Sequence, residues 1–202
     1  MNVAGVLLLR FIGSLEHSAE AQAAYAVGYA ELFSLITWTS VGLMGAAAAV
    51  AGQNLGAGHP QRSMQAVRIA AEYGVGVAAI VGALFLLIPD ALLAIFGLED
   101  PTVVALGRQL LRYLSVSGFF ISIALTYTGG LQGTGDTRSP LFITLASQVV
   151  VPIGLCFTLQ GLDRLTPAGV WTAIVLGHAT RCVLSVARFQ QARWKHIKVE
   201  LH

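Results

Sequence analysis

One carboxylate lies inside a long apolar stretch of the sequence, and it is the residue best suited to carry an ion. Glu31 stands about ten residues into the segment 21–51. In a helix this places the carboxyl group ~15 Å from the start of the segment. A carboxyl group at such a depth in a membrane is costly, and it indicates a functional site. We expect Glu31 to bind a proton on one side and release it on the other. The alternative is a structural role, either in an ion pair with Arg10 or as a hydrogen-bonded packing residue.

A second group of side chains has types that suit the wall of a cavity for bulky cations. These residues are weakly polar, apart from one indole whose face attracts positive charge. The candidates for lining a cavity are Ser34, Trp38, Ser122, Thr126 and Gln148. Ser34 and Trp38 share a helical face with Glu31. For Ser122 and Thr126, which recur with other small residues on one face of the segment 106–131, helix packing is the alternative, and we favour it.

The last apolar segment carries two further polar residues, His178 and Arg181. We expect Arg181 to extend towards the lipid head groups. A proton-transfer role for His178 is a further hypothesis. No histidine or cysteine has metal-ligand spacing, and the sequence holds neither HExxH nor GxSxG. We therefore expect no metal site, no cofactor and no enzyme.

The composition indicates an integral membrane protein. The 202 residues are 55% hydrophobic and only 11% charged, with a mean hydropathy of +0.72. A soluble domain has about 25% charged residues. Apolar stretches near the length of a membrane-spanning helix alternate with short charged patches. The net charge of +2 and the absence of a basic run give no indication of nucleic-acid binding. Cys156 and Cys182 fall in apolar segments, where they are expected to be inert.

The apolar segments predict an all-α membrane protein, a single domain over residues 1–202. The expected helices cover about 1–15, 21–51, 69–89, 106–131, 140–160 and 167–187, followed by a basic tail at 188–202. The first segment is too short to cross a membrane, which needs ~20 residues. We interpret it as a helix truncated at its start. Residues 52–68 are expected to form a polar connection.

Proline marks three expected helix starts. Asp100-Pro101, Ser139-Pro140 and Thr166-Pro167 each pair an N-cap side chain with proline at the first helical position. Pro152 lies within the segment 140–160 and is expected to kink that helix.

Basic residues favour one orientation in the membrane. Loops taken alternately place seven basic residues on one side and three on the other. The first side holds Arg62, Arg68, Arg138, Arg188, Arg193, Lys195 and Lys198, and the other holds Arg108, Arg112 and Arg164. By the positive-inside rule the first side, with the C-terminus, is cytoplasmic.

Two glycine-rich stretches stand out beside these segments. GQNLGAG occupies residues 52–58 and GTGDTRSP occupies residues 133–140. Glycines at this spacing allow close approach of helices, and the second stretch is otherwise expected to be a turn with Asp136 and Arg138 in solvent. A phosphate-binding loop is excluded because no Gly-Lys-Ser/Thr ending follows.

Together the two stretches resemble those of the multidrug and toxic-compound extrusion (MATE) family. GVWTA at 169–173 and RFQQARW at 188–194 are typical of its last helix. The resemblance implies that the chain is the C-terminal six-helix lobe of a twelve-helix transporter. The residues that match the family motifs, with a structural role, are Gly52, Gln53, Gly56, Gly58, Gly133, Gly135, Asp136, Arg138 and Pro140.

The resemblance implies secondary active export of amphiphilic, often cationic, compounds in exchange for H⁺ or Na⁺. Some eukaryotic members have a glutamate at a similar distance before the Gly-Ala-Gly element, which corresponds to Glu31. Many bacterial members have an acidic residue in the fourth helix of this lobe, but 106–131 has none, so no Na⁺ ligands are assigned.

The expected partners are the lipid bilayer, a small-molecule substrate, and an N-terminal lobe or second half-transporter. The expected location is the cell membrane, as in a bacterial inner membrane, with several spans and a cytoplasmic C-terminus. Two alternatives stay open: a flippase for lipid-linked oligosaccharides, for which only Arg10 and Arg181 could hold a pyrophosphate, and an inactive truncated fragment.

Overall fold

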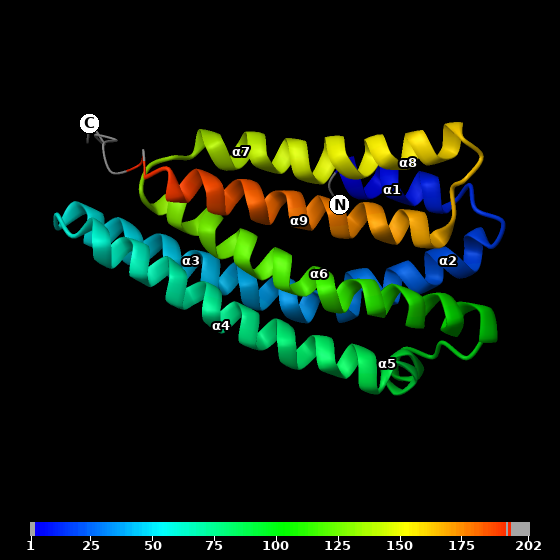
Figure 1. Cartoon of the computed structure of the whole chain (residues 1–202). Helices are drawn as coiled ribbons and strands as arrows, with labels where there is room; N and C mark the ends of the chain where they lie inside the picture. Colours follow the sequence, from blue (N-terminus) through cyan, green and yellow to red (C-terminus); the bar gives the residue numbers. More distant parts are fainter. Residues whose placement is uncertain (1–2, 193, 195–202) are drawn as a thin grey trace.

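The protein is a bundle of long helices that run roughly side by side (Figure 1). The computed structural model describes residues 3–192 and Trp194, and every regular element in this part of the chain is helical. The elements are α1 (Val3–Ile12), α2 (Ser18–Tyr25), η1 (Ala26–Leu32), α3 (Ser34–Gly56), α4 (Pro60–Leu87), α5 (Pro89–Ile95), α6 (Pro101–Gly133), α7 (Arg138–Leu145), η2 (Ala146–Val150), α8 (Val151–Gly161) and α9 (Pro167–Gln190). The expected all-α membrane fold is confirmed.

Several of these elements join into continuous helices of membrane-spanning length. Within the described residues, five helices are long and apolar enough to cross a membrane: Ser18–Gly56, Pro60–Leu87, Pro101–Gly133, Arg138–Gly161 and Pro167–Gln190. Helix α1 has ten residues and packs against α2, α8 and α9. The central helix is α6, which packs against α3, α4 and α9 (Figure 1).

The two glycine-rich stretches meet where α3 and α6 cross at closest distance. A methyl group built on Gly133 would lie 2.0 Å from the Ala48 carbonyl oxygen, and one on Gly129 would lie 2.1 Å from that of Met44. From the side of α3, a methyl group on Gly52 would lie 2.6 Å from the Gly133 carbonyl oxygen. The absence of side chains at these three positions is what allows the two backbones to touch.

The connection expected at 52–68 is mostly helical. Helix α3 continues to Gly56, and the next helix begins at Pro60 rather than at Ile69. Only a short turn remains, in which Gly58 has a φ of +78°. The hydroxyl of Ser63 donates to the Ala51 carbonyl oxygen at 2.7 Å and joins the two helices there. The sequence pattern located only the apolar part of each helix. Both helices extend beyond that part through polar residues.

Two of the three expected helix starts are confirmed. The Asp100 carboxylate accepts hydrogen bonds from the amides of Thr102 and Val103, and the Thr166 hydroxyl accepts from the amide of Gly169. The expected cap at Ser139 is wrong, since α7 already begins at Arg138. The cap at this start comes from Asp136, described below.

Two π-helical turns interrupt the membrane spans. Segment η1 separates α2 from α3, and η2 separates α7 from α8 directly before Pro152. Proline has no N–H to donate to the preceding turn, so a local change of helix type there follows from the sequence. The basic tail begins later than expected, because α9 continues to Gln190. Residues 193 and 195–202 lie outside the described part of the chain.

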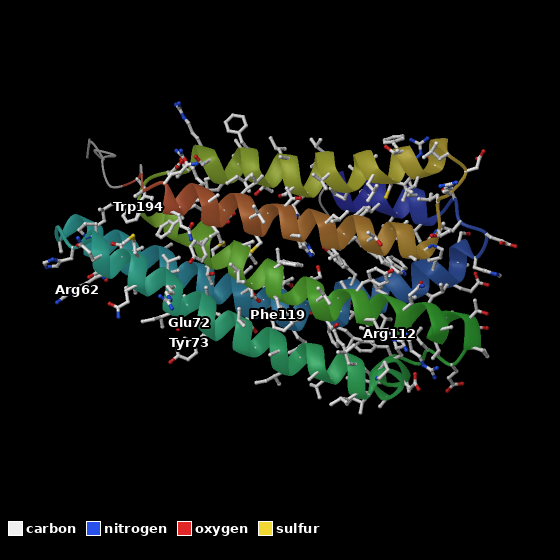
Figure 2. The ribbon with its side chains drawn as sticks, in the orientation of Figure 1. Arg62, Glu72, Tyr73, Arg112, Phe119 and Trp194 are labelled. Carbon is white, nitrogen blue, oxygen red and sulfur yellow. The ribbon has the colours of Figure 1, made fainter. Side chains whose placement is uncertain are left out.

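The loops alternate between the two ends of the bundle. The connections at 57–59 and 134–137 lie at one end, and those at 13–17, 88–100 and 162–166 lie at the other (Figure 1). Arg62 and Arg112 lie towards opposite ends (Figure 2). These two arginines lie at opposite ends, as the sequence pattern predicted for them.

Candidate functional site

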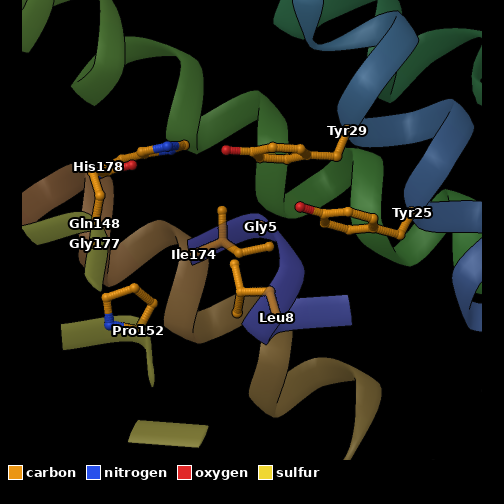
Figure 3. Close-up of a pocket in the computed structure, with 9 residues that line it drawn as sticks. All are labelled: Gly5, Leu8, Tyr25, Tyr29, Gln148, Pro152, Ile174, Gly177 and His178. Carbon is orange, nitrogen blue, oxygen red and sulfur yellow. The ribbon is translucent and has the colours of Figure 1, made fainter. Parts of the chain in front are cut away.

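A cavity with a mixed polar and apolar lining lies between α1, α2, η1, η2, α8 and α9. It offers about 80 Å³ to the centres of water molecules, enough for several of them. Its lining residues are Gly5, Leu8, Tyr25, Tyr29, Gln148, Pro152, Ile174, Gly177 and His178. Figure 3 shows the rings of Tyr25 and Tyr29 directed from one side towards Ile174 and His178 on the other.

His178 is held rigidly at one wall of this cavity. Its side chain is buried, and its Nδ1 shares a hydrogen bond with the Ser117 hydroxyl of α6. The imidazole stacks on Phe33 and on Tyr29, with ring centroids 5.7 and 6.4 Å apart. Tyr29 and Phe33 also stack on each other, with centroids 5.5 Å apart, so the three rings form one aromatic cluster. The bond to Ser117 uses Nδ1 and leaves Nε2 as the ring nitrogen that could act on a bound group.

Two side chains next to this cavity carry buried donors without a partner. Gln148 Nε2 and Arg181 Nε have no hydrogen-bond acceptor among the described residues. Arg181 stands one turn beyond His178 on α9, and its charge acts on both His178 and Tyr29. Arg181 is partly buried and its Nε is fully buried. Its extension to the lipid head groups stays a prediction.

A larger groove opens on the surface of the lobe, next to the cavity. It has a volume of about 560 Å³ and is lined mainly by η1 and α3, with two residues of α1 and Tyr25 of α2. Tyr25 and Tyr29 line both the groove and the cavity, so the two spaces share one aromatic wall. Ser34 and Trp38, expected from sequence to line a cavity, both line this groove, and Trp38 is 73% exposed.

Glu31 lies on the outer surface of the lobe, at the margin of the groove. It belongs to η1, and its backbone carbonyl accepts a hydrogen bond from the Ser34 hydroxyl. The side chain is exposed. The alternative of an ion pair with Arg10 is wrong: the ion pairs among the described residues include neither of these two side chains.

Ser122 and Thr126 lie in helix packing. Both are fully buried in α6. The Ser122 hydroxyl bonds that of Ser40 on α3 at 2.8 Å, and the Thr126 hydroxyl donates to carbonyl groups of its own helix. Neither hydroxyl is directed to a free surface. This agrees with the helix packing that the sequence analysis favoured for these two residues.

The family-motif residues form a buried ion pair at the other end of α6. Asp136 is 6% exposed, and its carboxylate accepts from the amide and hydroxyl of Ser139 and from Arg188 at 2.8 Å. Burial alone would raise the pKa of Asp136, but the bonds from Ser139 and Arg188 outweigh it and hold the pKa below its ordinary value. The expectation of a solvated Asp136 is therefore wrong, whereas Arg138 is exposed as expected.

The other motif residues divide between contacts and turns. Gly52 and Gly133 are at the α3–α6 contact, and Pro140 is buried. Gly135 has a φ of +92° in its turn. Gln53, Gly56 and Gly58 are exposed.

Some residues of the site were not found from the sequence. Tyr25 and Tyr29, with centroids 5.0 Å apart, are one helical turn apart and could have been recognised as a stacked pair. Ser117 and Arg188 act across long sequence separations, and no local signal identifies them. No group of three or more histidine, cysteine or acidic residues could hold a metal ion among the described residues.

Three comparisons with known proteins all find similarity to transporters of one family. A sequence-family model described as MatE matches residues 1–158. The probable multidrug resistance protein NorM of Thermotoga maritima is 26% identical over 191 residues, which cover 95% of this chain and 40% of that protein. The crystal structure of the eukaryotic MATE transporter AtDTX14 is similar with a TM-score of 0.80 at 21% identity, covering 95% of this chain and 42% of that one. The chain thus spans about two fifths of the length of both.

Proposed function

The chain belongs to the MatE family, and we propose that it forms the C-terminal lobe of a secondary active efflux transporter. Members of this family are multi-pass membrane transporters and not enzymes. Alternating access needs two lobes that move around a central site. The proposed partner is therefore an N-terminal lobe or a second half-transporter. It would cover the face formed by α2, η1 and α3.

The exposure of Glu31 is the observation that carries this proposal. Glu31 lies inside the span Ser18–Gly56, yet its side chain is on the surface of the lobe. A carboxylate facing lipid at this depth would be costly. The surface around Glu31 must then face water or protein, which is what a cleft between two lobes provides. The groove with Trp38 lies on this same surface.

We assign ion coupling to Glu31 and substrate binding to the groove. The transported compounds are amphiphilic, and their export is exchanged for H⁺ or Na⁺. An indole as exposed as that of Trp38 also suits cationic compounds of the kind that the resemblance implies. We place the protein in the cell membrane with the C-terminus in the cytoplasm. Arg62, Arg138 and Arg188 lie at the same end of the bundle as the end of α9, and by the positive-inside rule this end is cytoplasmic. The flippase alternative is weaker, because Arg10 is exposed at the end of α1 and only Arg181 lies inside.

The test is an efflux assay in cells that contain the protein with its second lobe. Glu31→Gln removes the ionisable group and should abolish export driven by an ion gradient. Glu72→Gln is the matched control, because Glu72 is an exposed glutamate on α4 that pairs with Arg68 at 3.0 Å. It should leave export unchanged. Gradient-driven export that persists at the wild-type rate in Glu31→Gln would show that Glu31 does not couple transport.

A further inference from the structure

A groove between α7 and α9 lies at the end of the bundle that also holds the connection 134–137 (Figure 1). It has a volume of about 410 Å³. Its lining includes Ser139, Phe142, Ile143, Leu184, Arg188 and Gln191. None of its lining residues lines the groove at Trp38 or the cavity at His178. The proposed transport function therefore leaves this α7–α9 groove without a role.

The lining of the α7–α9 groove changes from polar to apolar along the helices. Ser139 lies in the first turn of α7, and Arg188 and Gln191 lie at the end of α9. One helical turn further along each helix, the lining is formed by Phe142 and Leu184, which are 67% and 38% exposed. A bilayer has the same order, with polar head groups outside the hydrocarbon core. The groove therefore matches the two parts of a lipid molecule.

The polar end of the α7–α9 groove offers hydrogen-bond donors. Arg188 Nε donates to Asp136 Oδ2 at 2.9 Å, Nη2 lies 2.8 Å from the same oxygen, and Nη1 donates to Gln191 Oε1 at 3.3 Å. A guanidinium has five N–H groups, so these bonds leave two of them for a further acceptor. The bond to Gln191 uses its amide oxygen and leaves its amide nitrogen as a donor. A group bound here must therefore supply acceptor atoms.

The same end of the α7–α9 groove has a net positive charge. The charge of Arg188 is balanced by Asp136, which is 6% exposed and does not line the groove. Arg138, next to Ser139 in the chain, is exposed, and the ion pairs printed for the described residues do not include it. Arginine binds phosphate oxygens through charge-assisted hydrogen bonds, and basic residues at the end of a membrane span attract anionic lipids.

We infer that the α7–α9 groove binds an anionic phospholipid. Its phosphate diester accepts hydrogen bonds from Arg188 and Gln191, and one acyl chain lies along Phe142 and Leu184. Such a lipid joins the start of α7 to the end of α9. This site does not depend on the transport function, since the face proposed to meet a second lobe is formed by α2, η1 and α3.

The test places a reporter in the α7–α9 groove of the purified chain in lipid vesicles. Leu184→Trp introduces an indole there, and the chain without this change corrects for its own three tryptophans. Brominated acyl chains quench a tryptophan that they contact. Two vesicle series contain either brominated phosphatidylglycerol, which is anionic, or brominated phosphatidylcholine, which is zwitterionic, each diluted in unlabelled phosphatidylcholine.

We expect the reporter to bind phosphatidylglycerol about fivefold more tightly than phosphatidylcholine, which is the effect of one basic residue near the membrane surface. Equal binding would overturn the inference, because the groove would then hold lipid without regard to charge. Absence of quenching by both lipids would show that a protein covers the groove and would also overturn it. Soluble glycerol phosphate should not displace the lipid, and full displacement would contradict a lipid site.

Variants in the reporter protein assign the preference to the α7–α9 groove. Arg138→Gln should lower the preference for phosphatidylglycerol about fivefold, and Arg188→Gln should lower it as well. If Arg188→Gln does not fold, Gln191→Leu takes its place, because Gln191 is exposed. Arg164→Gln is the matched control, since it removes an exposed arginine at the opposite end of the bundle, and it should retain the full preference. An unchanged preference in the folded groove variants would refute the site.

Discussion

The contact between α3 and α6 predicts a large effect of a single added methyl group. In Gly133→Ala the new methyl carbon would lie 2.0 Å from the Ala48 carbonyl oxygen, and alanine has no rotamer that avoids it. Overpacking of this kind costs up to about 3 kcal/mol. The helix preference of alanine over glycine returns up to about 1 kcal/mol. The net destabilisation is therefore about 2 kcal/mol, which for a chain of this size lowers the Tm by about 4–8 °C.

The assay is thermal unfolding in detergent micelles, followed by the fluorescence of the buried Trp171 and Trp194. Gly45→Ala is the matched control on α3, because nothing lies within 4 Å of a methyl group built there. It should not lower the Tm. The double variant Gly52→Ala, Gly133→Ala should lose less stability than the sum of the two single variants, because each change pushes the same two helices apart. A Gly133→Ala protein that unfolds at the wild-type temperature would refute the close contact.

Three further changes test other parts of the structure. Asp100→Ala removes both cap bonds of α6 and should cost about 1 kcal/mol of stability in thermal unfolding. Thr137→Ala, at the start of α7, removes no cap bond and should cost little. Equal losses in the two variants would contradict the cap at Asp100. Asp136→Ala should cost about 1–3 kcal/mol at neutral pH. Because the pKa of Asp136 is lowered on folding, its contribution is present above the ordinary carboxyl pKa and is lost as the pH falls through the folded-state value. The difference from wild type should therefore shrink below about pH 4 in unfolding measurements, and a constant difference would argue against the ion pair. Ser122→Ala should cost about 1 kcal/mol and the pair Ser40→Ala, Ser122→Ala little more, because the two hydroxyls share one bond; additive losses would contradict this pairing.

Composition and apolar length predicted the helices because lipid demands long apolar segments with satisfied backbones. The same signal could not give the C-terminal end of α3 or the start of α4, since α3 continues through Gln53 and Asn54 and α4 already includes Gln61 and Arg62. It also placed the cap of α7 at Ser139, directly before Pro140. In the structure Asp136 accepts the hydrogen bond from the Ser139 amide instead.

The candidate site was predicted in part. The sequence singled out Gln148 as a cavity residue, and Ser34 and Trp38 by their helical face, because local spacing determines which residues share a face. It did not show that Arg181 Nε is buried, because packing determines the depth and direction of a long side chain. The bonds from Ser117 to His178 and from Arg188 to Asp136 join distant parts of the chain, and no local pattern reports such contacts.

The most direct test of the account is the accessibility of the groove face within the membrane. In a background with Cys156→Ala and Cys182→Ala, single cysteines replace Ala30 in the groove and Ala79 on the outer face of α4, both of which are exposed. A thiol reacts as its thiolate, which forms in water and not in lipid. The account predicts that a water-soluble maleimide labels Ala30→Cys and leaves Ala79→Cys unlabelled. Equal resistance of both cysteines would show that water does not reach the groove, and this would contradict a water-filled transport cleft at Glu31.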